Sequence, residues 1–185
     1  VTDSNHLMVM DKELKSIFKF DISGILTLDE AILKNDTPGR LMTGIIGGLG
    51  TTDDKTKFKD NISMVTYNNY IYVLDYDHDD KKCAIKVFDT QLNWINSYDI
   101  STLISTNALI DISYNTKTSS FYILCHNYSY ETINSLSPDV SSQAPANLIE
   151  LDSNLSHVVT TPLIDVTKNG TDMISEVHRH IYFSN

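Results

Sequence analysis

Two short strand-like segments recur along this chain, always in the same order. The first is a run of apolar and aromatic residues, found at 7–10 (LMVM), 71–74 (IYVL), 121–124 (FYIL) and 181–184 (IYFS). The second follows it and ends in aspartate, at 18–21 (FKFD), 86–89 (KVFD) and 149–152 (IELD). Short runs rich in aromatic and branched residues favour β-strands. The chain is therefore predicted to repeat one β-strand unit.

The spacing of these segments predicts the fold class. Successive copies of the first segment lie 64, 50 and 60 residues apart, from 7 to 71, 71 to 121 and 121 to 181. Repeats of roughly 40–50 residues or slightly more, built from short strands, are typical of β-propeller blades. We therefore expect an all-β fold: a segment of a β-propeller made of four-stranded antiparallel blades, with very little helix.

The repeat also predicts the boundaries of the blades. One complete blade spans 62–100, with strands at 62–65, 70–75, 84–89 and 94–100, and a second spans 109–163. The second-strand tyrosines Tyr72, Tyr122 and Tyr182 are expected to be buried. A partial blade at 7–28 would supply strands two to four, and another at 172–185 the first two strands. Residues 29–61 are expected to link the first partial blade to the first complete one.

About three blades are present, whereas propellers have four to eight. We therefore expect the chain to be part of a larger propeller, the alternative being a ring assembled from several copies. In either case the strands near residues 7 and 181 would lack a neighbour in their own blade. Exposed strand edges invite pairing, so these edges should be completed by more of the same polypeptide or by another subunit.

Charge and composition exclude several functional classes. Fourteen basic and 24 acidic residues give a net charge of −10, which repels nucleic-acid backbones and anionic membranes. No apolar run reaches the roughly 18–20 residues of a transmembrane helix. We expect a soluble chain with no nucleic-acid partner and no membrane span. Cys83 and Cys125 fall on strands of different blades and are expected to be separate thiols rather than a disulfide.

Residues 47–89 resemble the NHL repeat of six-bladed propellers. The residues that carry the resemblance are 47–50 (GGLG), 53–54 (DD), Phe58, 62–65 (ISMV), 71–75 (IYVLD) and 85–89 (IKVFD). Asn61 stands where the family often has proline, and 77–82 (DHDDKK) replaces its Asn-x-Arg. The resemblance implies the propeller architecture. Some propellers of this type are lyases or lactonases with a metal near the axis, so it leaves an enzymatic alternative open.

The densest ligand-like cluster follows the strand at 70–75. Asp75, Asp77 and Asp79 alternate as at the start of a calcium loop, but an EF-hand needs Gly and Glu where this chain has Asp80 and Lys86. We interpret the cluster as a solvated hairpin tip, with weak calcium binding as the alternative, and expect no other cofactor.

Other motifs do not identify a catalytic centre. His178 and His180 could form half of a metal site, but no histidine or carboxylate recurs at matched inner-strand positions. The glycine run at 44–50 fits no phosphate-binding motif and indicates backbone freedom at a crossover. There is no Gly-x-Ser-x-Gly elbow. We therefore nominate no catalytic residues and expect a protein that is not an enzyme.

The long connection at 127–146 is the candidate partner-binding region. Loops beyond about 12–15 residues are usually functional or disordered, and this one sets apolar residues among Ser and Asn: Tyr128, Tyr130, Leu136, Pro138 and Val140.

We expect a scaffold for protein–protein interaction or assembly. The composition, rich in Asn, Asp, Ser, Thr and Ile, resembles that of many phage virion proteins. Tail proteins of short-tailed phages also use propeller modules, so a virion or phage-tail component is the specific hypothesis. A metal-dependent propeller lyase or lactonase-type hydrolase is the alternative.

Overall fold

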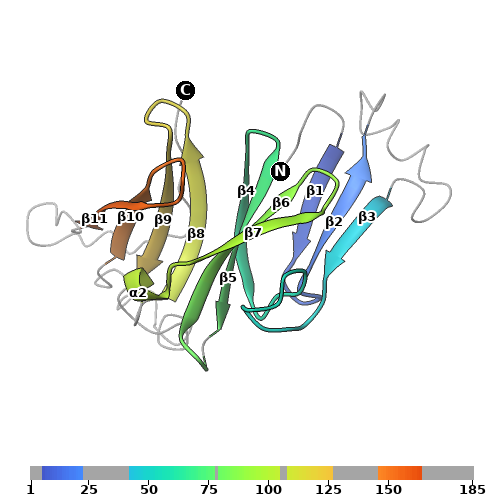
Figure 1. Ribbon diagram of the computed structural model, residues 1–185, viewed down its shortest axis with the longest axis horizontal. Helices are drawn as coiled ribbons and strands as arrows, with labels where there is room; N and C mark the ends of the chain where they lie inside the picture. Colours follow the sequence, from blue (N-terminus) through green and yellow to red (C-terminus); the bar gives the residue numbers. More distant parts are fainter. Residues whose placement is uncertain (1–5, 23–41, 78, 105–107, 127–145, 164–185) are drawn as a thin grey trace, which may run out of the picture. The chain divides into compact units, whose positions relative to one another are not determined.

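The computed structural model describes residues 6–22, 42–77, 79–104, 108–126 and 146–163 (Figure 1). Within these residues the chain forms eleven β-strands and one short helix, α2 (Ser101–Ile104). The strands make three antiparallel sheets, two of four strands and one of three. The expected all-β fold class is confirmed.

The first four-stranded sheet contains β4 (Asn61–Tyr67), β5 (Tyr70–Asp77), β6 (Lys82–Asp89) and β7 (Trp94–Asp99), side by side in chain order. These strands coincide with the four segments expected within 62–100. Asn68 and Asn69 join β4 to β5 with φ values of 50° and 63°, as a two-residue hairpin turn requires. β5 is buried along its length after Tyr70, which explains its nearly continuous apolar sequence.

The second four-stranded sheet repeats this arrangement. It contains β8 (Ala108–Asn115), β9 (Ser120–His126), β10 (Ala146–Leu151) and β11 (His157–Leu163), in the order β11-β10-β9-β8. The strands again match the expected segments, while the predicted partner-binding loop lies outside the described residues. Tyr72 and Tyr122 are buried as expected. Cys83 and Cys125 are both free and buried, which confirms two separate thiols.

The three-stranded sheet corrects the prediction for the first part of the chain. Its order is β1 (His6–Asp11), β2 (Ser16–Asp21) and β3 (Met42–Gly47). β3 lies inside 29–61, where we expected only a linker. The last strand expected in the partial blade at 7–28 falls largely outside the described residues. Glycines weaken a strand pattern because they contribute no side chain to pack. At Gly44, Leu92 fills this space, with Cδ1 3.1 Å from where a Cβ would lie.

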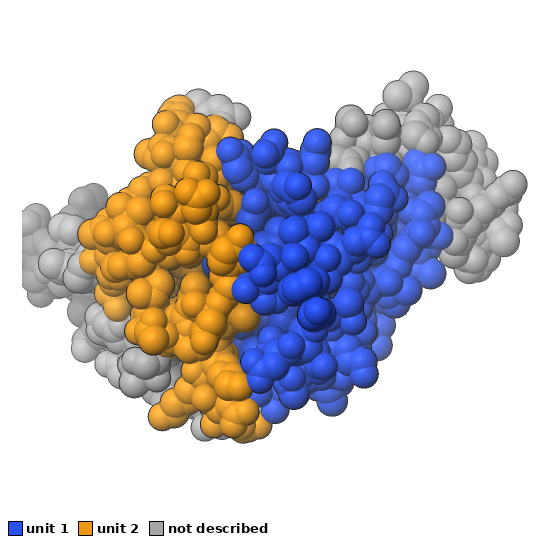
Figure 2. Space-filling model, viewed as in Figure 1, with its two compact units in different colours: residues 1–77, 85–97 blue, residues 78–84, 98–185 orange. Residues whose placement is uncertain are grey.

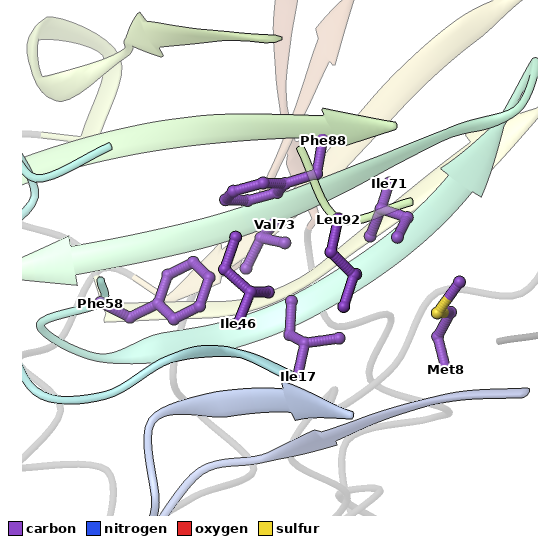
Figure 3. Close-up of a cluster of buried hydrophobic side chains, with 8 residues drawn as sticks. All are labelled: Met8, Ile17, Ile46, Phe58, Ile71, Val73, Phe88 and Leu92. Carbon is purple, nitrogen blue, oxygen red and sulfur yellow. The ribbon is translucent and has the colours of Figure 1, made fainter. Parts of the chain in front are cut away.

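The chain divides into two compact units, coloured separately in Figure 2. The first comprises residues 1–77 and 85–97, and the second residues 78–84 and 98–185. The core of the first unit draws side chains from all three strands of the three-stranded sheet and from the four-stranded sheet (Figure 3). Its members are Met8, Ile17, Ile46, Phe58, Ile71, Val73, Phe88 and Leu92. Burying each such side chain is worth about 1.5–3 kcal/mol, so this cluster binds the two sheets of the unit together.

One turn recurs in both four-stranded sheets, between the third and fourth strands. In the first sheet, Asp89 Oδ1 accepts hydrogen bonds from the backbone N–H groups of Gln91 and Asn93, both at 2.8 Å. Asp152 Oδ1 does the same for Asn154 and Ser156, at 2.8 and 2.9 Å. This shared geometry explains why the second recurring segment ends in aspartate at 86–89 and 149–152.

Each of these turns contains a leucine in a backbone conformation that usually belongs to glycine. Leu92 has φ 66° and Leu155 has φ 64°, a region that costs a residue with a Cβ about 1–2 kcal/mol. Both leucine side chains are nevertheless buried. Burial of the leucine therefore offsets the strain of the turn.

The Asp89 turn makes the stability of the protein depend on pH. Partial burial raises the pKa of Asp89, but hydrogen bonds from the Asn93 side chain and from the Asn93 and Gln91 amides outweigh it and hold the pKa below its usual 3.8. A carboxylate whose pKa is lower in the folded state stabilises the fold above its unfolded pKa, and this contribution is lost as pH falls through the folded value. We expect Asp89→Asn to flatten the acid limb of stability against pH. Urea unfolding between about pH 5 and pH 2 measures this, and an unchanged slope would contradict it.

The glycines after β3 provide a second test. Gly47 has φ 127°, and a Cβ there would lie 2.3 Å from the Lys15 carbonyl oxygen, whereas Gly48 has φ 97° and open space around it. Gly48→Ala should therefore cost only backbone strain, about 1–3 kcal/mol. Gly47→Ala should cost more, because strain and a clash with backbone add. Chemical denaturation of the two variants gives the comparison, and equal costs would show that the backbone yields at Gly47.

Candidate functional site

The most unusual chemical feature of the described chain is an ion pair inside the first four-stranded sheet. Asp75 on β5 and Lys86 on β6 are both completely buried, with Lys86 Nζ 2.8 Å from Asp75 Oδ2. Both strands are buried on both faces, so neither charge reaches water. Charged groups in such a position must be paired and hydrogen-bonded, because their desolvation is costly.

The Lys86 ammonium is surrounded by oxygen atoms. It donates hydrogen bonds to the backbone carbonyls of Thr51, at 3.0 Å, and Lys57, at 2.6 Å. Asp75 Oδ2, at 2.8 Å, is its third oxygen neighbour and its counter-ion. The ammonium also lies 5.3 Å from the ring centroid of Phe58, within the range of a cation–π interaction.

Asp75 is held by the same stretch of chain. Its Oδ1 accepts hydrogen bonds from the backbone N–H groups of Lys59, at 3.0 Å, and Asp60, at 2.9 Å. Burial raises the pKa of Asp75, and the nearby Lys86 ammonium and these two amides oppose that rise. The carboxylate thus has a counter-ion on one oxygen and two donors on the other.

All of these backbone partners belong to residues 48–60, which we call the capping loop. It runs between β3 and β4, and its two ends are tied by hydrogen bonds from Gly50 N to the Phe58 carbonyl and from Phe58 N to the Gly48 carbonyl. Phe58 is fully buried and packs edge-on against Phe88, with centroids 5.9 Å apart. The capping loop therefore closes over the ion pair and inserts a side chain into the core.

Further charges hold the end of the capping loop from outside. Lys15 Nζ lies 2.6 Å from Asp60 Oδ1, and Lys59 Nζ lies 3.7 Å from Asp77 Oδ1. At the other side of the loop, Lys55 sits over the Trp94 ring, 4.5 Å from its centroid. Each pair has at least one partly exposed member, so each contributes little by itself. Together they favour the closed position of the loop.

The structure separates the three aspartates that the sequence grouped as a weak calcium candidate. Asp75 points into the core and is saturated by Lys86 and the capping loop, Asp77 lies beside Lys59, and Asp79 is exposed at the hairpin tip. Across the described ranges, no three His, Cys, Asp or Glu side chains gather as metal ligands. The solvated hairpin-tip interpretation holds for Asp79, which is exposed, and is wrong for Asp75 and Asp77, which are buried on β5.

Several predicted site residues fall outside the described residues. They are the partner-binding candidates Tyr128, Tyr130, Leu136, Pro138 and Val140, and the histidines His178 and His180. Sequence reasoning also missed the role of Lys86. The available signal was a lysine in the middle of an apolar strand, at the repeat position where the second sheet has Ile149.

No protein-family model matches the chain, and no curated protein gives a significant match. The part of the chain that the structure describes has no helix long and apolar enough to cross a membrane.

The buried pair can be tested by removing its members singly and together. We expect Asp75→Asn and Lys86→Met each to cost about 3–5 kcal/mol of unfolding free energy, because each leaves a buried charge unpaired. The double variant should cost less than the sum, because its second change removes the charge left by the first. Urea unfolding of all four proteins gives the coupling energy.

Lys15 and Asp60 provide the matched control for this cycle. Their contact is as short, at 2.6 Å, but the side chains are 25% and 22% exposed. Lys15→Met should therefore cost only about 0–1 kcal/mol. If Lys86→Met were no more costly than Lys15→Met, burial would not be the source of the energy.

Proposed function

We propose that the chain is a non-enzymatic scaffold for protein–protein interaction or assembly, built on a propeller-type arrangement of sheets. The observation that carries the proposal is the use of the buried ionisable groups. Asp75 and Lys86 neutralise each other, and Lys19, the other buried lysine among the described residues, donates to the Thr90 carbonyl at 2.7 Å and the Gln91 side chain at 3.2 Å. These charges hold strands and loops in place, a structural use of buried ionisable groups that supports a scaffold.

The repeated sheet supports the propeller part of the proposal. Two successive four-stranded sheets have their strands in chain order and share the aspartate turn between the third and fourth strands. β1 and β2 carry the second and third strand segments of the same repeat. Repetition of one rigid antiparallel unit is how propellers present loops along a rim.

The partner is proposed to bind at the 127–146 connection between β9 and β10. Tyrosine contributes a large contact area at low conformational cost, and two tyrosines occur there among Ser and Asn. The composition favours a virion or phage-tail component as the particular kind of assembly. Protein partners, or other subunits of the same assembly, would meet this loop.

The scaffold proposal predicts association that depends on this loop. Light scattering of the purified protein should give a mass above the 20.9 kDa of one chain. Deleting 128–145 should return the mass to that of a single chain and leave the circular dichroism of the strands unchanged, since the length of a loop has little effect on stability. Leu14→Ser, which removes an apolar group that is 60% exposed in the β1–β2 turn, is the control and should keep the larger mass.

Two results would contradict the proposal. One is a compact monomer for the intact protein and the deletion variant alike. The other is a stoichiometric zinc or calcium ion retained through purification, which would favour the metal-dependent lyase or hydrolase.

A further inference from the structure

We propose that the groups around Lys86 Nζ form a binding site for a small primary ammonium ion, and that the chain's own lysine is its resident occupant. The site consists of the Thr51 and Lys57 carbonyl oxygens, the Asp75 carboxylate and the face of Phe58. This inference concerns the interior of the first unit and goes beyond the scaffold function.

The composition of this ammonium site matches one class of cation. A primary ammonium carries three N–H donors and no acceptor, and three oxygens stand within 2.6–3.0 Å of the nitrogen. The single negative charge of Asp75 balances its charge. A quaternary ammonium has no donors for the carbonyls, and a neutral alcohol has no charge for the carboxylate. Both should be excluded.

The walls of the ammonium site are fixed by contacts that do not involve Lys86. The Lys59 and Asp60 amides orient the Asp75 carboxylate through its other oxygen. Backbone hydrogen bonds at Gly48 and Gly50 hold Phe58, which also packs against Phe88. Truncating Lys86 should therefore leave a cavity lined with oxygens and carrying a negative charge. Such a cavity favours a cation, just as an apolar cavity takes up an apolar guest.

Lys19 provides the matched contrast. It is also buried, at 4% exposed, but its ammonium donates to one backbone carbonyl and one side-chain amide, neither of which carries a charge. Lys19 attracts the Asp89 carboxylate electrostatically, but among the described residues no carboxylate forms an ion pair with it. The same truncation at Lys19 therefore leaves no carboxylate in contact with the vacated ammonium position. An added primary ammonium ion should therefore stabilise Lys86→Ala and not Lys19→Ala.

The experiment uses the full chain with Lys86→Ala and n-propylammonium, which replaces the lost carbon atoms and the ammonium. Ligand binding to the folded state raises stability in a saturable way, so the urea midpoint should rise with propylammonium up to about 100 mM and then level off. The wild type, Lys19→Ala and Lys86→Met should show no such rise, the last because methionine fills the cavity. Tetramethylammonium and 1-propanol at the same concentration should have no effect on Lys86→Ala.

If Lys86→Ala does not fold alone, the same proposal predicts that dialysis from urea into propylammonium restores the circular dichroism of β-strands. The proposal is overturned if propylammonium neither raises the midpoint nor restores folding. It is also overturned if tetramethylammonium acts equally well, or if Lys19→Ala responds to the same extent.

Discussion

The first unit of this protein depends on a charge that has been taken out of water. Lys86 lies in the middle of a strand buried on both faces, and its ammonium can be tolerated there only if every donor finds an oxygen. Two of those oxygens come from the capping loop, which in turn supplies the amides for Asp75. The loop conformation, the position of Phe58 and part of the core are thus consequences of one buried cation.

The second four-stranded sheet shows that the architecture does not require this charge. By the repeat, Cys125 and Ile149 occupy the positions of Asp75 and Lys86, and both are buried. Apolar groups of this kind can be buried in a sheet without a charged or hydrogen-bonding partner. The ion pair therefore accounts for a local feature of the first unit, the closure of the capping loop. It is not a requirement of the four-stranded sheet itself.

The strands of the two four-stranded sheets could be predicted from sequence because their apolar segments repeat and end in the same aspartate turn. β3 could not, since Gly44 and Gly47 remove the side chains on which a strand pattern depends, and Leu92 fills the space from a distant part of the chain. Lys86 was visible as a lysine in an apolar run. Its partners were not, because two of them are backbone carbonyls, which every residue carries. The prediction that Asp75 belongs to a solvated hairpin tip was wrong for a related reason: the capping loop, which is distant in sequence, decides the burial of Asp75.

The order in which the capping loop can form has a kinetic consequence. The hydrogen bonds from Lys86 to Lys57 and Thr51 span 29 and 35 residues, whereas the β5–β6 hairpin that presents the ammonium closes locally. Closing a long loop costs chain entropy before the contacts that it brings together can stabilise the fold. The capping loop should therefore close after the hairpin, beyond the main folding barrier. Interactions made after the barrier leave the folding rate unchanged and slow unfolding. The buried ammonium should then set the unfolding rate of the first unit, and so its lifetime, rather than its folding rate.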